Sequence, residues 1–296
     1  MPDKKIAVVG IPGKWSTEVL AEAVREKILE CPIIEMGDVC LNLERKQLRF
    51  NDIDLCTYDA IIVKKISASY CPATLDRLEM LRFAESRGVR VFSPALNMLR
   101  LIDRMSCTVT LANHGIAMPP TVITEDETRA IEAVHSYSSA VFKPLYSTKA
   151  RGMQVINASD SQLVEKIKRF HQENPVMYIQ KKLTLEKDFG MVFLGGNYLG
   201  TYARVKQGNS WNTTINSGGK YQLHDPPQST IDLAYQAQKP FQMDFTTVDV
   251  ADTESGPIVF EVSAFGGFRG AKEGIGIDVA SLYVDYVLES LENGKK

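Results

Sequence analysis

The segment at residues 246–269, TTVDVADTESGPIVFEVSAFGGFR, constrains the fold of this chain more than any other segment. Two runs of alternating apolar residues flank a cluster of turn-forming residues at 252–257, and this pattern predicts a β-hairpin. A turn centred near residues 254–255 would place Asp249 directly or nearly opposite Glu261. The segment therefore predicts two carboxylates that face each other across a pair of strands.

The two faces of this hairpin should differ in chemistry. Because side chains alternate along a strand, Glu261 and Ser263 should lie on one face. Phe260 and Val262 should lie on the other face, which is apolar. Like charges placed directly across a ladder destabilise a sheet, so we expect a cation between Asp249 and Glu261, and oxygen ligands of this kind suit magnesium. The hairpin alone leaves open the alternative of an acidic face exposed to solvent.

Composition argues against several classes of partner. The net charge of -2 gives no overall basic field for nucleic acid or for an anionic membrane. No apolar run approaches the roughly 18 residues that a membrane-spanning helix needs. The five cysteines are scattered without metal-binding spacing, which favours reduced thiols over a disulfide framework. We therefore expect a soluble, cytoplasmic α/β protein that binds neither nucleic acid nor membrane.

Strands and helices alternate in the first hundred residues. Apolar runs at 5–10, 59–63 and 89–92 predict strands, and residues from about 16 and at 73–87 have helical spacing. The turn between the first strand and helix contains Gly, Pro and Lys but lacks the spacing of a phosphate-binding loop. This order predicts a small open sheet with right-handed crossovers.

The chain becomes rich in strands after about residue 140. Two alternating runs around Gly195 and Gly196 predict a second hairpin. A closing helix should begin after Asp278, which is a suitable N-cap residue. The expected buried face of that helix comprises Val279, Leu282, Tyr283, Tyr286 and Val287.

Three features of this part of the chain indicate a nucleotide site. Lys143 interrupts an apolar strand, where a buried lysine needs an anion. The loop at 147–152 is small, polar and basic, as expected of a flap that covers phosphates. The hairpin with Asp249 and Glu261 would supply the metal. Each feature has its own alternative, namely an edge lysine that reaches solvent, a solvated turn and an acidic surface.

The order of these segments resembles the ATP-grasp superfamily. The matching blocks are KPLYSTKARGM, YIQKKL, DFGMVFLGGNYLGTYARV, WNTTINSGGK, TTVDV and VFEVSAFGGF. The chain looks most like the RimK-type glutamate ligases, from LIDRMSCTVTLANHGIAMPPT to GIGIDVASLYVDYVL. Its sequence as a whole resembles still more the ATP-grasp enzymes of the GAK system. The resemblance implies a small open α/β pre-ATP-grasp domain at 1–102 and a two-lobed ATP-grasp domain with an antiparallel sheet at 103–296. Its first lobe would span 103–185 and its second lobe, with the metal site, 186–296.

The resemblance also implies roles for individual residues in binding ATP. Lys143 matches the strand lysine that contacts an ATP phosphate. Lys181, Lys182 and Leu183 match the hinge whose backbone reads adenine. Asp188 matches an aspartate after the hinge that also contacts ATP.

Further matches concern the chemistry of the site. Arg204 matches an arginine near the transferred phosphate, and Asp249 and Glu261 match two magnesium carboxylates. Ser263 stands where the family has a third metal ligand with an amide oxygen, so this ligand is a hydroxyl or is missing.

Other positions depart from the family pattern. The hinge glutamate is Lys181, the arginine after Asp188 is Gly190, and the arginine before the Gly-Gly turn is Asn212, which we still assign to the nucleotide site. Loss of arginines weakens neutralisation of charge in the transition state unless other cations substitute. The candidate substitutes are Lys149, Arg151 and Arg269.

The resulting expectation is an ATP-dependent ligase that joins a carboxylate to an amine through an acylphosphate. Its cofactors would be ATP and Mg²⁺, with Mn²⁺ as a possible replacement, and its substrates a small carboxylate or peptide-like molecule and an amine. Lys64, Lys65 and Arg269 are candidate anchors for an anionic substrate, or alternatively a solvated basic patch. A homo-oligomer is possible. The alternative functions are a small-molecule kinase and a non-catalytic, nucleotide-binding regulatory protein.

Overall fold

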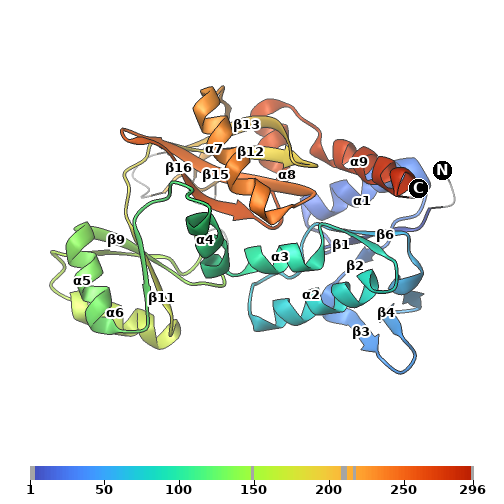
Figure 1. Ribbon diagram of the computed structural model, residues 1–296, viewed down its shortest axis with the longest axis horizontal. Coiled ribbons are helices and arrows are strands. Elements are labelled where there is room, and N and C mark those ends of the chain that lie inside the picture. The colour runs from blue at the N-terminus through green and yellow to red at the C-terminus, as the bar shows by residue number, and fades with distance from the viewer. Residues whose placement is uncertain (1–3, 148–149, 208–211, 216–217, 295–296) are drawn as a thin grey trace.

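The computed structural model describes residues 4–147, 150–207, 212–215 and 218–294. Figure 1 shows three regions: an N-terminal unit in blue and cyan, a separate green lobe, and a yellow-to-red region above the N-terminal unit. The first and last helices, α1 (Trp15–Ile28) and α9 (Val279–Asn293), pack together. No helix within these described ranges is long and apolar enough to span a membrane.

A four-stranded parallel sheet organises the N-terminal unit, as predicted. Its strand order is β2-β1-β6-β7. The four residues of β1 are all fully buried, which is typical of a parallel strand covered on both faces. The strands are β1 (Ile6–Val9), β2 (Ile33–Ile34), β6 (Ala60–Val63) and β7 (Arg90–Phe92).

The alternation of side chains along β1 distributes them between two cores. Ala7 and Val9 pack with α2 (Pro72–Glu85) and α3 (Ala95–Ile102). Ile6 and Val8 pack instead with residues of α1 and α9. A small antiparallel sheet that was not predicted lies between β2 and β6 in sequence. It comprises β3 (Val39–Asn42), β4 (Gln47–Phe50) and β5 (Ile53–Asp54).

The green lobe in Figure 1 is an antiparallel sheet of order β10-β9-β11-β8 with two helices on it. Its core is separate from the other two, and Phe142 and Phe170 pack edge to face at its centre. The helix α4 (Arg104–Asn113) leads into this lobe. Its elements are β8 (Thr121–Thr124), α5 (Glu127–Tyr137), β9 (Ser139–Lys143), β10 (Gln154–Asn157), α6 (Leu163–Glu173) and β11 (Met177–Lys181).

The C-terminal region contains a five-stranded antiparallel sheet of order β14-β13-β12-β15-β16. Both predicted hairpins are present, one around Gly195 and Gly196 and the other at the acidic segment. The strands are β12 (Lys187–Leu194), β13 (Asn197–Val205), β14 (Lys220–Leu223), β15 (Phe245–Thr253) and β16 (Gly256–Ser263). The remaining helices are α7 (Gln228–Gln238) and α8 (Phe268–Ile275).

Two predictions about side-chain direction are wrong. A bulge between Asp249 and Val250 leaves Phe260 as the extra residue of the acidic hairpin. Phe260 therefore faces Lys143, while Val262 is buried as expected. In α9, whose N-cap is Asp278 as predicted, Leu282 is 42% exposed because the buried stripe passes through its neighbours instead.

Candidate active site

One cleft of about 1020 Å³ lies among the N-terminal unit, the green lobe and the C-terminal sheet. It brings together every predicted site residue that the structure describes. These are Lys143, Arg151, Lys181, Lys182, Leu183, Asp188, Arg204, Asn212, Asp249, Glu261, Ser263 and Arg269. Lys149 lies outside the described residues.

The acidic hairpin forms one wall of this cleft. Asp249 on β15 is paired with Glu261 on β16, as the sequence predicts. Ser263 lies two residues after Glu261 and opposite Thr247, so it shares the face that carries the two carboxylates. Both strands belong to the five-stranded sheet, whose opposite face packs in a hydrophobic core. This packing fixes the position of the wall.

Arg204 connects two of the acidic residues. It lies opposite Asp188 on neighbouring strands, and its guanidinium pairs with both oxygens of that carboxylate. Its Nη2 atom also lies 3.1 Å from Oδ1 of Asp249. Burial raises the pKa of Asp249 well above its usual range although Arg204 opposes the shift, and nearby Glu261 adds to it. A cation bound at Asp249 would therefore relieve an unfavourable environment.

Arg104, which the sequence analysis missed, is the partner of the other hairpin carboxylate. Its Nη1 atom donates a 2.9 Å hydrogen bond to Oε2 of Glu261. The same guanidinium donates to the carbonyl oxygens of Pro144 and Ser147 at 3.5 and 3.4 Å. Arg104 thereby fastens the start of the basic loop to the hairpin. Asp249 and Glu261 are thus each paired with an arginine.

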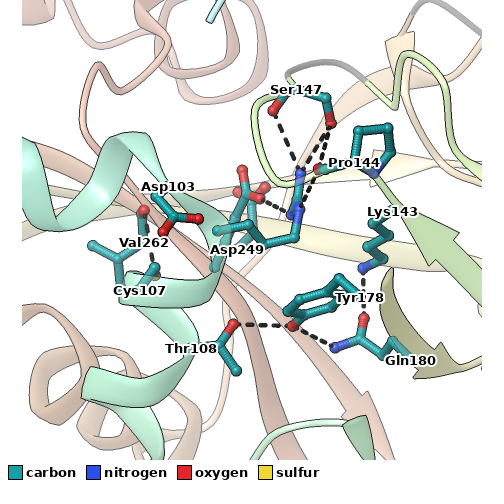
Figure 2. Close-up of polar contacts among 12 residues, drawn as sticks. Asp103, Cys107, Thr108, Lys143, Pro144, Ser147, Tyr178, Gln180, Asp249 and Val262 are labelled. Carbon is teal, nitrogen blue, oxygen red and sulfur yellow. Dashed lines mark hydrogen bonds and ion pairs between the residues drawn. The ribbon is translucent and has the colours of Figure 1, made fainter. Parts of the chain in front are cut away.

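Lys143 is buried at the end of β9, with 8% of its surface exposed. Its Nζ atom donates to Oε1 of Gln180 and lies 5.6 Å from the centre of the Phe260 ring. Figure 2 shows Lys143 and Gln180 together with Tyr178, whose hydroxyl is 3.0 Å from that of Thr108. Burial, aided by the charge of Arg104, lowers the pKa of Lys143 to about 7. An anion beside Lys143 would restore its charge.

The hinge begins at Lys181, the last residue of β11. The backbone N–H of Lys181 donates to the carbonyl of Pro120, and that of Lys182 donates to the carbonyl of Ser139. Both hinge donors are thus already used to join β11 to its neighbours. Lys181, Lys182 and Leu183 all line the cleft.

The structure explains the absence of an arginine at position 190. Gly190 lies opposite Tyr202, and a Cβ atom at Gly190 would come within 2.2 Å of the Tyr202 ring. A Cβ atom at Gly270 on α8 would come within 2.3 Å of the same ring. The ring thus fills the place of a side chain at 190.

The remaining predicted cations differ in their surroundings. Arg151 is exposed and donates to the carbonyl of Ala68 at 3.5 Å. Arg269 pairs with Glu273 at 3.5 Å and lies over the Trp15 ring. Lys64 is only 5% exposed, so the alternative of a solvated basic patch is wrong for this residue. Asn212 accepts hydrogen bonds from the backbone N–H and the hydroxyl of Thr214, which order its own loop.

The donor set on the hairpin fits a hard divalent cation bound together with phosphates. Asp249 and Glu261 offer carboxylate oxygens on one face, and Ser263 adds a hydroxyl. Within the described residues, no group of three or more His, Cys, Asp or Glu is arranged to hold a metal without other ligands. The set suits a metal that completes its coordination with phosphate oxygens and water.

Only weak sequence signals marked the residues that were missed. Arg104 follows Asp103, which caps the start of α4, and Gln180 is the one polar residue inside the strand MYIQK before its final lysine. Both signals are common at ordinary structural positions. Their role becomes visible only when residues 37 or more positions apart are brought together.

A family model described as the RimK-like ATP-grasp domain matches residues 102–287 of this chain, well over half of its length. The tetrahydromethanopterin:alpha-L-glutamate ligase of Methanosarcina acetivorans is 24% identical to the chain, with 98% of this chain and 99% of that protein covered. A probable alpha-L-glutamate ligase 2 of Hahella chejuensis is also 24% identical, with 98% and 97% covered.

Solved structures share the fold. The structure of the ATP-grasp ligase PsnB, complexed with a phosphomimetic variant of its minimal precursor, Mg and ADP, superposes with a TM-score of 0.76. The alignment covers 98% of this chain and 100% of that one, at 14% sequence identity. The predicted arrangement, an open α/β unit followed by an ATP-grasp fold with an antiparallel sheet, is confirmed at this level.

Proposed function

This chain belongs to the family of RimK-like ATP-grasp domains, and on that basis we propose that it is an ATP- and magnesium-dependent ligase that joins a carboxylate to an amine. The observation that carries the proposal is the pairing of Asp249 with Glu261 in the cleft that also holds Lys143 and Arg204. Two acidic and two basic groups at one place suit a metal-bound triphosphate.

ATP would bind between the green lobe and the C-terminal sheet. We assign adenine to the hinge, because Lys181, Lys182 and Leu183 all line the cleft. Lys143 would contact a phosphate after leaving Gln180, and Asp188 and Asn212 complete the nucleotide site. Arg104 is added to this set because its guanidinium already lies among Pro144, Ser147 and Glu261.

Asp249, Glu261 and Ser263 would hold the metal, Mg²⁺ or alternatively Mn²⁺. When bound, the metal would supply positive charge that stabilises the phosphate groups as the bond between the γ-phosphorus and ADP breaks. Arg204 and Arg104, which pair with Asp249 and Glu261, would lie beside the phosphates of the bound nucleotide. Most of the catalysis would thus be positioning and charge neutralisation.

The reaction would proceed in two steps. A carboxylate oxygen of the first substrate forms a bond to the γ-phosphorus as the bond to ADP breaks, which gives an acylphosphate. The amine then forms a bond to the acyl carbon, phosphate leaves with the bonding electrons, and the amine loses a proton. Arg204 is the candidate for neutralising charge on the transferred group, and Lys149, Arg151 and Arg269 are candidates for replacing the missing arginines in this role.

The substrates remain a proposal within this class. The two relatives are named as alpha-L-glutamate ligases, so glutamate is the first amine to test. The partner acid would be a small carboxylate or a peptide-like molecule. We further propose a cytoplasmic protein that forms homo-oligomers, with domains at 1–102 and 103–296.

Release of ADP tests this proposal against its rivals. A ligase needs both an acid and an amine, a kinase needs one acceptor and yields a phosphorylated product, and a regulatory protein turns over neither. Release of ADP that is complete with the acid alone, and yields a stable phosphorylated product, would identify the kinase.

The metal assignment has its own test. The double variant Asp249→Asn and Glu261→Gln should bind ATP about 10- to 100-fold more weakly in Mg²⁺, because it loses both charged metal ligands. Asp252→Asn is the matched control, since Asp252 lies on the same hairpin but not in the cleft. Calorimetry with and without Mg²⁺ measures the effect. Unchanged affinity in the double variant would show that the metal binds elsewhere.

A further inference from the structure

The crevice between the carboxyl ends of β1 and β6 opens into the same cleft as the nucleotide site. In the order β2-β1-β6-β7 the chain leaves β1 toward one side of the sheet and enters β6 on the other side. This is the point where a parallel sheet reverses its strand order, and ligands bind preferentially in the crevice at such points. Nothing in the assigned nucleotide site uses this crevice.

Two consecutive lysines form the β6 side of the crevice. The backbone N–H groups of Lys64 and Lys65 both donate to the carbonyl of Val9, at 2.8 and 3.2 Å, so both residues are fixed at the end of β1. The Nζ atom of Lys64 lies 4.4 Å from the centre of the Phe268 ring and that of Lys65 lies 4.2 Å from the Tyr70 ring. Both side chains line the cleft.

Lys64 is buried, which is unusual for a lysine. It is 5% exposed, and its Nζ atom donates a 2.7 Å hydrogen bond to the carbonyl of Gly266. No carboxylate in the described part of the chain lies within ion-pair distance of it. An ammonium group has three hydrogens, so the carbonyl leaves further donors for a ligand. Burying a charged lysine without an opposite charge is costly. Binding of an anion beside Lys64 would remove this cost.

The charges of the whole cleft point the same way. Its described lining includes ten basic side chains and three carboxylates, an excess of seven basic groups. ATP brings about four negative charges, and its metal offsets some of these. The ten lining residues that come from positions 11–70 include three lysines and no carboxylate. These three lysines thus face no carboxylate from their own part of the chain, whereas the three carboxylates of the lining all come from residues 188–261.

We propose that this crevice, with Lys64 and Lys65, binds a second anionic group of the carboxylate substrate. The acid would then carry two anionic groups, one that reacts with ATP and one, a carboxylate or a phosphate, that anchors it. The inference rests on the proposed ligase function.

Chain geometry limits the size of this substrate. The reacting carboxylate must lie near Glu261, and the carbonyl partner of Lys64 is on Gly266, five residues later. Five extended residues span at most about 18 Å. The backbones of Glu261 and Gly266 are thus separated by a distance on the scale of a small molecule or a short peptide.

Binding of matched acids to the full chain, loaded with Mg²⁺ and a non-hydrolysable ATP analogue, tests the inference by calorimetry. Glutarate has two carboxylates, pentanoate has one at the same carbon count, and 4-phosphonobutyrate exchanges one carboxylate for a phosphonate. We expect at least about tenfold tighter binding for one or both of the dianions than for pentanoate. The tighter of the two identifies the anchoring group as carboxylate or phosphate.

Variants connect this preference to the lysines. Lys64→Met and Lys65→Met should each reduce it to within about threefold, whereas Lys64→Arg and the exposed control Lys168→Met should retain it. Melting curves verify folding, and Lys65→Met serves if Lys64→Met fails to fold. Equal binding of dianion and monoanion, no binding of either acid, or a preference that both Met variants retain, would overturn the inference.

Failure of the ligase proposal would look different. Trapping the acylphosphate with hydroxylamine gives a hydroxamate only if the bound acid is activated. A dianion preference that depends on Lys64, without hydroxamate from any acid, would leave the anion site in place and refute the ligase. Hydroxamate from pentanoate and glutarate at equal efficiency would support the ligase and refute the anchoring site.

Discussion

At the scale of single residues, the site is defined by charges that are buried before any ligand arrives. Lys64 and Lys143 have little solvent around them, and Asp249 depends on Arg204 for compensation. Burial, aided by the charge of Lys65, lowers the pKa of Lys64 to about 7. A group whose pKa differs between the folded and unfolded states makes the free energy of unfolding depend on pH.

We predict that Lys64 makes the protein more stable as pH rises between about 7.5 and 9.5. In this window the unfolded lysine, with a pKa near 10.4, keeps its proton while the folded lysine loses it, so the unfolded state binds more protons and the free energy of unfolding increases with pH. One such group contributes about 1 kcal/mol per pH unit. Urea unfolding at both pH values should therefore show a smaller rise in Lys64→Met than in the wild type.

The comparison between variant and wild type removes contributions that the two proteins share, including those of the buried cysteines. Lys168→Met, an exposed change on α6, should keep the wild-type slope. Parallel slopes in the wild type and Lys64→Met would mean that Lys64 stays charged in the folded protein.

Sequence reasoning succeeded for residues whose local pattern carries the signal. Lys143 was predicted because it interrupts an apolar strand, and Asp249 and Glu261 because the turn sets their register. Phe260 was misplaced because a bulge adds one residue to its strand, which no local pattern marks. Arg104 was missed because its partner Glu261 is 157 residues away.

At the scale of elements, close packing of α8 against the C-terminal sheet shapes the wall of the cleft. The Tyr202 ring on β13 lies between Gly190 on β12 and Gly270 on α8. Neither glycine has a positive φ angle. Glycine is therefore required at both positions only because a larger side chain would overlap the ring. A departure from the family pattern at position 190 is thus matched by an aromatic ring in the same place.

We predict that Gly270→Ala and Gly190→Ala each lower the free energy of unfolding by about 2–3 kcal/mol, because the added methyl group would overlap the buried Tyr202 ring. Gly267→Ala is the matched control: it lies three residues from Gly270, and a Cβ atom there has no neighbour within 4 Å. This change should alter stability by less than about 1 kcal/mol. Urea denaturation measures all three, and equal midpoints for Gly270→Ala and Gly267→Ala would contradict the packing argument.

At the scale of the whole molecule, the N-terminal unit and the C-terminal sheet share their interior. Ile6 and Val8 of β1 belong to one core with Phe245 and Tyr283. Val9, from the other face of the same strand, belongs to a second core that reaches β12 and β15. The green lobe has a core of its own. The family and its two-part fold could be predicted from ordered motifs, but this sharing could not, because it depends on contacts between segments over 200 residues apart.

The shared cores predict how the molecule tolerates shortening. A fragment of residues 103–296 would expose apolar side chains of both cores, so we expect it to lose cooperative thermal unfolding and the near-ultraviolet circular dichroism of its buried aromatic residues. Replacing residues 121–181 by a short Gly-Ser linker should preserve both signals. The two ends of that excision are adjacent, since Thr121 pairs with Gln180 and the N–H of Lys181 donates to the carbonyl of Pro120 at 2.8 Å. A sharp, cooperative transition in the 103–296 fragment would show that the two cores are separable and that the N-terminal unit is an accessory to an independently stable domain.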